Sequence, residues 1–374
     1  MSINRSEMPK LGFGLMRLPQ KNDEIDLKRL EMMVDAYMGA GMNYFDTAYV
    51  YHEGDSESAA REALVKRYPR ESFRIATKLP AWEMKEKADR DRIFSEQLER
   101  AGVEYYDFYL LHSVEDGNID KYEELDCFRW GVEKKKEGKI RHFGFSFHGS
   151  PQLLVRLLDE HPEVEFVQIQ LNYIDWNNQI VHSGELYRIL EERHIPIIVM
   201  EPCKGGTLAS LKPEMEEKYR ALRPDSSIAS WAFRFAGSLP GVMTVLSGMS
   251  DEDQMRDNLS TFTAFEPLSD KELGVIDEVR TAMLNIPLIG CTSCRYCCDG
   301  CPAGISIPDV FRAVNTMTMY REDFRPRAFY NGMREATKTG RASDCIACGQ
   351  CESVCPQHLP VIELMKDAAK KLDV

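Results

Sequence analysis

The sequence contains neither a long apolar run nor an excess of positive charge. No run reaches the roughly 18 consecutive apolar residues that a membrane-spanning helix needs. The formal net charge of -13 opposes binding to nucleic acids and anionic membranes, because both depend on Lys and Arg side chains that contact phosphates. No basic and then apolar leader stands at the N-terminus. We therefore expect a cytoplasmic protein with no nucleic-acid or membrane partner.

The glycine-rich turn of a dinucleotide-binding open sheet is also missing. Gly12-x-Gly14 continues with Leu15-Met16-Arg17, without the third glycine and the helix that such a turn requires. Instead, β-rich apolar runs alternate eight times with helix-patterned stretches between Leu11 and Thr261, which is the pattern of βα units. Eight units in about 250 residues predict a closed (β/α)8 TIM barrel of the α/β class rather than a doubly wound sheet.

The expected barrel elements follow from these patterns. The strands are expected at residues 11–16, 43–45, 73–77, 108–111, 142–145, 167–171, 197–200 and 243–246. The helices are expected at residues 27–38, 57–66, 91–100, 122–136, 152–159, 184–193, 228–235 and 253–259.

A second domain is expected after the barrel. A helix over Ser269–Met283 follows the eighth unit, and Ile286-Pro287 marks the expected boundary, so we assign residues 1–285 to the barrel and 286–374 to the second domain. A chain of 374 residues has room for both. The β alternation stops at this point, and short helical patterns at residues 309–315, 327–337 and 361–372 predict a small, mainly helical domain.

Cysteine is scarce before the boundary and abundant after it. Only Cys127 and Cys203 precede residue 291, whereas nine cysteines lie between Cys291 and Cys355. A disulfide framework is not expected in a reducing compartment. The run Cys291-x2-Cys294-x2-Cys297-x3-Cys301-Pro302 recurs as Cys345-x2-Cys348-x2-Cys351-x3-Cys355-Pro356.

This spacing is that of bacterial ferredoxins with two 4Fe-4S clusters, in which the fourth cysteine of each run ligates the other cluster. This crossing rule assigns one cluster to Cys291, Cys294, Cys297 and Cys355, and the second to Cys345, Cys348, Cys351 and Cys301. Cys298 is then no ligand. Paired zinc sites are the alternative, but zinc gives no reason to repeat the third and fourth cysteines with a proline. The long, helix-patterned connection makes the region 289–360 resemble the α-helical ferredoxin modules of redox enzymes.

Polar residues stand where the second, third and fourth strands are expected to end. Asp46, Lys78 and His112 close these strands, and Tyr51 follows in the loop after Asp46. Since the strand ends of a barrel meet at one mouth, the four side chains are expected to converge. An ammonium held by a carboxylate would lower the pKa of the tyrosine, which could protonate a carbonyl oxygen as hydride reaches the carbon, while the histidine orients the substrate. Each residue alone is more often a cap, a core or a rim residue, and only the set favours catalysis.

The segments Phe45-Asp46-Thr47-Ala48 with Tyr51, Ala76-Thr77-Lys78 and Leu110-Leu111-His112 resemble the catalytic tetrad of the aldo-keto reductase family. The resemblance covers about residues 9–261. It implies a nicotinamide cofactor, NADP or NAD, bound in extended form at the barrel mouth. The positions that match the family's cofactor-binding residues are Ser146, Gln168, Met200, Ser247, Gly248, Gln254 and Asn258.

Two of these positions, and the residue after Ser146, depart from the family pattern. Phe147 follows Ser146 where the family usually has asparagine, Met200 stands where an aromatic usually stacks on the nicotinamide, and Gln254 stands where an arginine usually binds a ribose phosphate. The resemblance therefore leaves both NAD and NADP open.

The two halves together predict an oxidoreductase that reduces a small carbonyl compound, or oxidises an alcohol, in the barrel. Its clusters would exchange electrons with a ferredoxin or flavoprotein partner. A hydride carries two electrons, whereas a 4Fe-4S cluster normally passes one. Direct coupling of the barrel to the clusters would therefore need a flavin or radical intermediate, and no flavin motif is visible. The alternative is an electron-transfer or docking protein whose ferredoxin module recruits a redox partner, with clusters that are structural or oxygen-sensing. The complete tetrad favours the enzyme.

Overall fold

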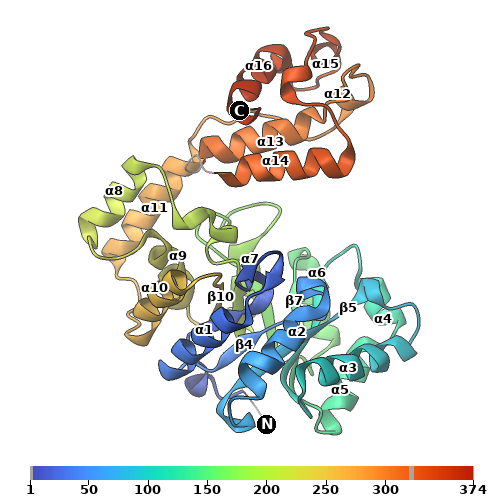
Figure 1. The fold of residues 1–374 in the computed structure, drawn as a ribbon, viewed down its shortest axis with the longest axis vertical. Helices are drawn as coiled ribbons and strands as arrows, with labels where there is room; N and C mark the ends of the chain where they lie inside the picture. Colours follow the sequence, from blue (N-terminus) through green and yellow to red (C-terminus); the bar gives the residue numbers. More distant parts are fainter. Residues whose placement is uncertain (1–2, 320–323, 374) are drawn as a thin grey trace. The chain divides into compact units, whose positions relative to one another are not determined.

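The computed structural model describes residues 3–319 and 324–373. Eight strands form the barrel, namely β1 (Leu11–Gly14), β4 (Tyr44–Asp46), β5 (Arg74–Pro80), β6 (Tyr106–Val114), β7 (Ile140–Phe147), β8 (Phe166–Gln170), β9 (Ile197–Met200) and β10 (Val242–Gly248). They pair in parallel in the order β1-β10-β9-β8-β7-β6-β5-β4, and β1 also pairs with β4, which closes the barrel (Figure 1). The predicted TIM barrel is confirmed, and each strand overlaps its expected position.

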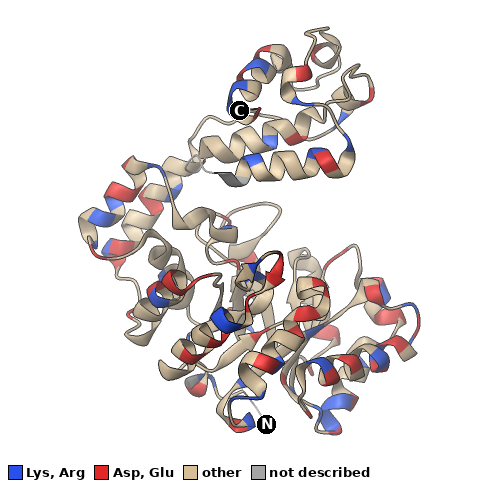
Figure 2. Ribbon diagram, viewed as in Figure 1, with Lys and Arg blue, Asp and Glu red and all other residues tan. Residues whose placement is uncertain are grey.

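Helices surround this barrel. They are α1 (Leu27–Gly39), α2 (Asp55–Ala60), α3 (Ala88–Ala101), α4 (Ile119–Glu124), α5 (Cys127–Lys136), α6 (Pro151–Glu160), α7 (Ser183–Glu192), α9 (Ile228–Ser238) and α10 (Glu252–Thr263). The side chains of Asp26, Ser150, Ser227 and Asp251 cap helices α1, α6, α9 and α10, each by accepting a hydrogen bond from the N–H three residues later. Figure 2 shows acidic and basic residues interspersed along the outer helices.

Three local features differ from the expected elements. The helix expected over residues 122–136 is divided into α4 and α5, because Asp126 adopts a left-handed conformation with φ of 57°. The helix expected over residues 57–66 continues from α2 as a π-turn, Arg61–Val65. A short hairpin of β2 (Gln20–Lys21) and β3 (Glu24–Ile25) was not expected.

The barrel interior is filled by side chains from alternate strand positions. Together with Met8 from the segment before β1, they form one apolar cluster of Tyr44, Ala76, Phe108, Leu110, Phe166, Ile198, Met243 and Leu246. A larger apolar cluster fills the layer between the strands and the helices. The strands fit closely, since a Cβ at Gly144 of β7 would lie 2.2 Å from the carbonyl oxygen of Phe166. The barrel is therefore a packed core, and its open end is where chemistry is expected.

The chain packs into two compact units. Among the described residues, the first unit comprises those up to Ala209 together with Arg223–Ile276, and the second comprises Ser210–Leu222 together with those from Asp277 onward. The second unit thus includes α8 (Pro213–Leu222), a helix absent from the expected elements, and the end of α11 (Asp270–Leu284). Lys218 of α8 pairs with Glu278 of α11 at 2.6 Å. The proposed domain boundary after residue 285 stays a prediction.

The rest of the second unit is helical, as expected. It contains α12 (Tyr296–Asp299), α13 (Ile307–Met319), α14 (Phe324–Thr337), α15 (Gln350–Ser353) and α16 (Val361–Leu372). Its core packs apolar side chains of α13 and α16, such as Val310, Phe311 and Met365, around the buried Tyr330. No described helix of the protein has both the length and the apolar character needed to cross a bilayer.

A buried ion pair near the end of the first unit gives a stability prediction. Glu272 accepts hydrogen bonds from Arg234, from Arg223 and from the N–H and hydroxyl of Ser269. Burial alone would raise the pKa of Glu272, but these hydrogen bonds outweigh it and lower the pKa to about 2. The free energy of unfolding of Glu272→Gln should be about 3 kcal/mol smaller at neutral pH.

The pH dependence of this difference has a definite sign. Because the folded-state pKa lies below the ordinary value of 4.5, the carboxylate stabilises the fold fully above that pH. The difference between wild type and Glu272→Gln should shrink as the pH falls from there towards about 2. Denaturant unfolding followed by near-ultraviolet circular dichroism checks this, and a difference that grows on acidification would contradict it.

Candidate active site and cluster sites

The four predicted catalytic residues lie together at the mouth of the barrel. Asp46 ends β4, Lys78 lies near the end of β5, His112 lies in the last part of β6, and Tyr51 begins the 3-10 turn Tyr51–Gly54 after β4. The register aligns Pro80, two residues beyond Lys78, with His112 on the neighbouring strand. Parallel pairing of consecutive strands is thus what brings these residues together.

The ammonium of Lys78 is the centre of this group. It donates to Asp46 Oδ1 at 2.6 Å, to the carbonyl oxygen of Thr47 at 2.8 Å and to the hydroxyl of Tyr51 at 3.4 Å. Lys78 is 1% exposed and Asp46 2% exposed. A buried ammonium is tolerated only where its donors are satisfied and a carboxylate balances its charge, and both conditions hold here.

Burial and charge set the protonation states of the pair Lys78 and Tyr51. Burial disfavours the ammonium, but Asp46 and Tyr51 outweigh this effect and raise the pKa of Lys78 above 10.5, so it stays charged. Burial raises the pKa of Tyr51 above 10, and the Lys78 ammonium opposes this shift without reversing it. The lowered pKa of Tyr51 that the sequence predicted is wrong in its net direction, because desolvation of the phenol outweighs the effect of the ammonium. Tyr51 is therefore a protonated phenol at neutral pH.

His112 faces this phenol. Its ring lies 5.8 Å from the Tyr51 ring at 80°, and 5.2 Å from the ring of Trp82, which is half exposed. Burial, the Lys78 ammonium and His148 lower the pKa of His112 well below 6.5, so its imidazole is neutral. Among the described residues, neither its buried Nδ1 nor Asp46 Oδ2 has a hydrogen-bond partner.

A buried polar network behind Lys78 was missed at the sequence level. Gln97 Nε2 donates to the carbonyl oxygen of Lys78 at 3.0 Å, to Thr77 Oγ1 at 3.0 Å and to Glu57 Oε1 at 3.1 Å. Gln97 and Glu57 are wholly buried. The available signal was that Gln97 shares the apolar face of α3 with Ile93 and Ala101, at helical spacing. The network fixes the strand on which Lys78 stands.

Three predicted cofactor residues lie on neighbouring strands at the same mouth. Ser146 on β7 aligns with Gln168 on β8, and Ser146 Oγ accepts a hydrogen bond from the N–H of Ser113 at 2.7 Å. Gln168 Nε2 lies 3.6 Å from Met200 Sδ at the end of β9. Within the described chain, the buried Gln168 Oε1 has no partner, so it could accept from an amide N–H of a bound molecule.

The other four lie at the end of β10 and in α10. Asn258 Nδ2 donates to Ser247 Oγ at 2.9 Å, which ties the helix to the strand. Gln254 Oε1 accepts from the N–H of Ser250 at 2.9 Å, so its side chain closes the turn before α10. Gly248 aligns with Gly14 of β1. The structure thus groups the seven residues into two sets, one on β7, β8 and β9 and the other at the end of β10 and in α10.

The eight predicted cluster ligands surround two cavities in the second unit. One cavity is lined by Cys291, Cys294, Cys297 and Cys355, with Phe311 and Val361 among its apolar residues. The other is lined by Cys301, Cys345, Cys348 and Cys351, with Ile305 and Met365. All of these cysteines are free thiols, and Cys298 lines neither cavity. Apart from the thiols, the lining is mainly apolar, with Thr292, Arg295 and Gln357 at the first cavity and Gln350 at the second. Four thiols around a mainly apolar cavity suit a 4Fe-4S cluster, and the grouping equals that of the crossing rule. The ligand assignment itself stays a prediction.

The two cysteine loops have the same backbone conformation. Matching positions are left-handed in both, with φ of 58° at Ser293 and 56° at Ala347, and of 64° at Arg295 and 81° at Gly349. After the proline, Gly304 and His358 repeat the pattern at 59° and 49°. Left-handed residues are uncommon outside glycine, so their repetition shows that the loops are two copies of one structure.

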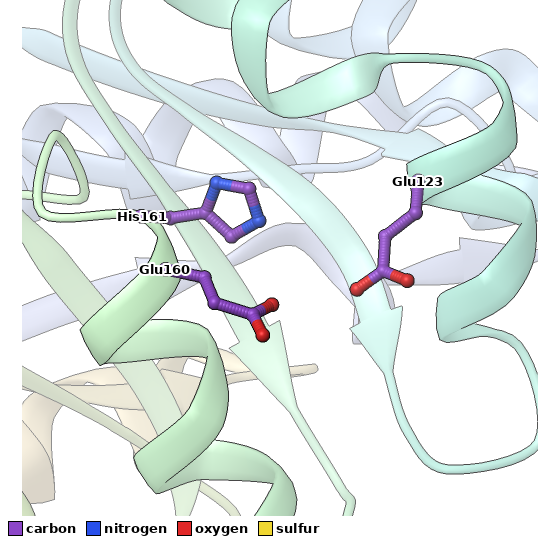
Figure 3. Close-up of side chains that lie close together, drawn as sticks. All are labelled: Glu123, Glu160 and His161. Atoms are coloured by element: carbon purple, nitrogen blue, oxygen red, sulfur yellow. The ribbon is translucent and has the colours of Figure 1, made fainter.

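A separate cluster of Glu123, Glu160 and His161 lies on the outside of the barrel (Figure 3). Arg156 Nη1 already bridges the two carboxylates, at 2.7 Å from Glu123 Oε1 and 2.9 Å from Glu160 Oε2. The His161 ring stacks on Phe128 at 3.7 Å. These contacts account for the cluster as an ion pair and a ring stack, and we assign it no ligand.

Comparisons with known proteins agree with both halves. Residues 10–281 match the model of the aldo/keto reductase family, and residues 290–360 match that of the 4Fe-4S dicluster domain. The uncharacterised oxidoreductase YqkF of Bacillus subtilis is 25% identical over 292 residues, which cover 69% of this chain and 88% of that protein.

Two solved structures show the same barrel. The aldo-keto reductase AKR11C1 of Bacillus halodurans, in its holo form, superposes with a TM-score of 0.58 at 25% identity and covers 72% of this chain and 91% of its own. An aldo-keto reductase of Klebsiella pneumoniae in complex with NADPH superposes with a TM-score of 0.59 at 20% identity and covers 73% and 91%, a likeness of fold. The family match spans most of the chain and agrees with the geometry of the barrel mouth. The chain therefore belongs to the aldo/keto reductase family, as an oxidoreductase with a C-terminal 4Fe-4S dicluster domain.

Proposed function

We propose that the protein interconverts a carbonyl compound and its alcohol with a nicotinamide cofactor, at Asp46, Tyr51, Lys78 and His112, and that two 4Fe-4S clusters exchange electrons with a redox partner. One observation carries the barrel chemistry. The buried ammonium of Lys78 joins the carboxylate of Asp46 and the hydroxyl of Tyr51 through hydrogen bonds.

These residues form a proton donor for a carbonyl oxygen. Tyr51 holds its proton at neutral pH, because burial raises its pKa. When the proton leaves, the Lys78 ammonium stabilises the phenolate, and Asp46 keeps that ammonium charged. When bound, the nicotinamide supplies the hydride to the carbonyl carbon or takes it back. In the reverse direction the phenolate accepts the proton of the alcohol.

His112 and Trp82 would orient the substrate. The neutral imidazole lies beside the phenol, so it can hold the same carbonyl oxygen without adding a charge that would oppose Lys78. The ring of Trp82 packs beside His112 and presents half of its surface to solvent. An apolar wall on one side of the reacting carbon favours carbonyl compounds with an apolar or ring-shaped face.

The residues at the mouth fit a nicotinamide dinucleotide. The unpartnered Gln168 Oε1 suits the carboxamide, with Ser146 and Met200 close by. The remainder of the dinucleotide would be held by Ser247, Gly248, Gln254 and Asn258. The NADPH in the Klebsiella pneumoniae relative supports this class of cofactor, and we propose either NADP or NAD.

The cysteine sets support the proposed electron exchange. When present, the clusters supply one-electron transfer. Cys294 and Cys348, one thiol of each set, are exposed, so a partner such as a ferredoxin or a flavoprotein could approach both clusters. Buried ligands alone would fit a structural role better.

Replacing Lys78 tests the proposed chemistry. Lys78→Met should lower carbonyl turnover by about 10²-fold or more, because the phenolate loses its stabilising charge. Anaerobic protein is assayed with NADPH and with NADH on a panel of aldehydes and ketones. Lys66→Met is the control, since Lys66 is exposed and pairs with Glu62.

A loss of folding is separated from a loss of catalysis by a double variant. Lys78→Met leaves Asp46 buried without its ion pair, which destabilises the barrel. The combination Asp46→Asn with Lys78→Met removes that charge and should fold, yet remain inactive. Wild-type rates in the folded double variant would contradict the proposal.

A further inference from the structure

The two matching cysteine loops differ in charge. We call the cluster assigned to the cavity of Cys291 the first cluster, and the cluster assigned to the cavity of Cys345 the second cluster. Arg295 and Gly349 stand at matching left-handed positions of the loops, with φ of 64° and 81°. Arg295 lines the first cavity, whereas no Lys, Arg, Asp or Glu among the described residues lines the second. The equivalent loops thus place a cation at one cluster site only.

The guanidinium of Arg295 is held in place from α13 and the residue before it. Its Nη2 donates to Asp309 Oδ2 at 2.7 Å, and its Nη1 donates to Ser306 Oγ at 3.3 Å. Asp309 is 6% exposed and also accepts from Arg312 Nη2 at 2.8 Å. Because two arginines share one carboxylate, the group keeps a net positive charge. Arg295 is partly exposed, so water weakens the effect of this charge without removing it.

The second loop carries a carboxylate where the first has none. Glu352 follows Cys351, at the position that Cys298 occupies in the first loop. Glu352 Oε1 accepts a hydrogen bond from the N–H of Ile362 at 2.8 Å, and Ile362 lines the second cavity. This contact holds a negative charge beside that cavity.

The other acids in or next to the two loops do not reverse this difference. Asp299 and Asp344 are exposed, and neither lines a cavity. Water therefore screens their charges more strongly than it screens a charge held at a cavity wall. A cation at the first site and an anion beside the second act in the same direction on the difference between the two reduction potentials.

We propose that Arg295 raises the reduction potential of the first cluster, so that the first electron is taken up there and the second cluster is reduced later. The inference rests on the proposed function, which supplies the clusters. A nearby positive charge stabilises an added electron, and a nearby negative charge destabilises it. Ile307 lines both cavities, so the two sites share a wall across which an electron can pass. An electron that a ferredoxin or flavoprotein donates to either cluster therefore comes to rest at the first.

Redox titration of the anaerobic full-length protein with dithionite, followed by electron paramagnetic resonance, tests this inference. The signal that remains in Cys348→Ser identifies the first cluster. In the wild type this signal should appear before that of the second cluster. Arg295→Gln keeps a donor for Asp309 but removes the charge, so it should lower the midpoint potential of the first cluster and narrow or reverse the gap. Arg295→Lys, which keeps the charge, should keep the wild-type order.

Two further variants act on the second cluster. Gly349→Arg introduces the matching cation, and a Cβ there would meet no described atom within 4 Å. It should raise the midpoint potential of the second cluster and leave that of the first unchanged. Glu352→Gln keeps an acceptor for Ile362 and should shift the second cluster in the same direction. Arg312→Gln is the matched control for Arg295→Gln, since Arg312 binds the same carboxylate but lines neither cavity, and its effect should be smaller.

The outcomes separate this inference from the proposed function. Unchanged midpoint potentials in Arg295→Gln protein that holds the iron of two clusters overturn the inference, and so does earlier reduction of the second cluster in the wild type. If Arg295→Gln loses iron, Gly349→Arg and Glu352→Gln decide, because a raised potential of the second cluster supports the inference and an unchanged one overturns it. The expected order without electron transfer from any ferredoxin or flavoprotein refutes the proposed exchange and leaves the inference standing. A wild type without iron overturns both.

Discussion

Tyr51→Phe should reduce the turnover of every carbonyl substrate by at least about 10²-fold, with the fold unchanged. The variant removes the one hydroxyl that lies within hydrogen-bond reach of Lys78 among the described side chains, and keeps the ring beside His112. The carbonyl oxygen then has no positioned proton donor. Stopped-flow reduction under anaerobic conditions measures the loss, and titration of NADPH and NADH shows whether cofactor binding survives.

Tyr49→Phe is the matched control for this variant. Tyr49 lies two residues earlier in the same loop, but its hydroxyl donates to Glu96 Oε2 at 2.6 Å, away from Lys78. It should keep wild-type turnover. Because the pKa of Tyr51 lies above its ordinary value of 10, wild-type reduction should stay active through neutral pH and decline only where the phenol titrates. Full activity in Tyr51→Phe would remove the tyrosine from the mechanism.

Cys348→Ser should cost about half of the bound iron and sulfide, because one of two equivalent clusters loses a ligand. Cys298→Ser should cost none, since Cys298 lines neither cavity although it adjoins Cys297. Iron, sulfide and zinc are measured on protein that was purified without oxygen. Equal iron in all three proteins, or stoichiometric zinc in the wild type, would refute the cluster assignment.

The crossing of the two cysteine runs can be checked on the same anaerobic protein by electron paramagnetic resonance. Cys301→Ser should alter the electron paramagnetic resonance signal that Cys348→Ser alters, although Cys301 belongs to the other run. Cys355→Ser should alter the signal of the first run instead. If each fourth cysteine affected the cluster of its own run, the crossing would be wrong and the two-cluster assignment would still stand.

The barrel could be predicted because strand signals are local. Buried apolar runs and the βα alternation located each strand, with differences confined to the ends. Elements whose existence depends on their surroundings could not be predicted in this way. The helix α8 carries charges such as Glu214, Glu217 and Lys218, and Met215, Glu216 and Tyr219 are its buried residues. The break between α4 and α5 depends on one left-handed residue, Asp126, in a stretch that otherwise favours helix.

The same distinction applies to the sites. The cysteine sets and the meeting of Asp46 with Lys78 followed from spacing and from strand ends, which are properties of short segments. The direction of the Tyr51 pKa depends on desolvation by residues far apart in the chain. The contacts of Gln97 likewise exist only after the barrel closes.

The repeated backbone of the two cysteine loops has a consequence for how the two clusters depend on each other. The left-handed positions recur in step, so the loops are structurally equivalent. Under the crossing assignment, each loop supplies three thiols to one cube and its last thiol to the other. Neither loop could then complete a cube by itself, and damage to either loop would affect both cubes.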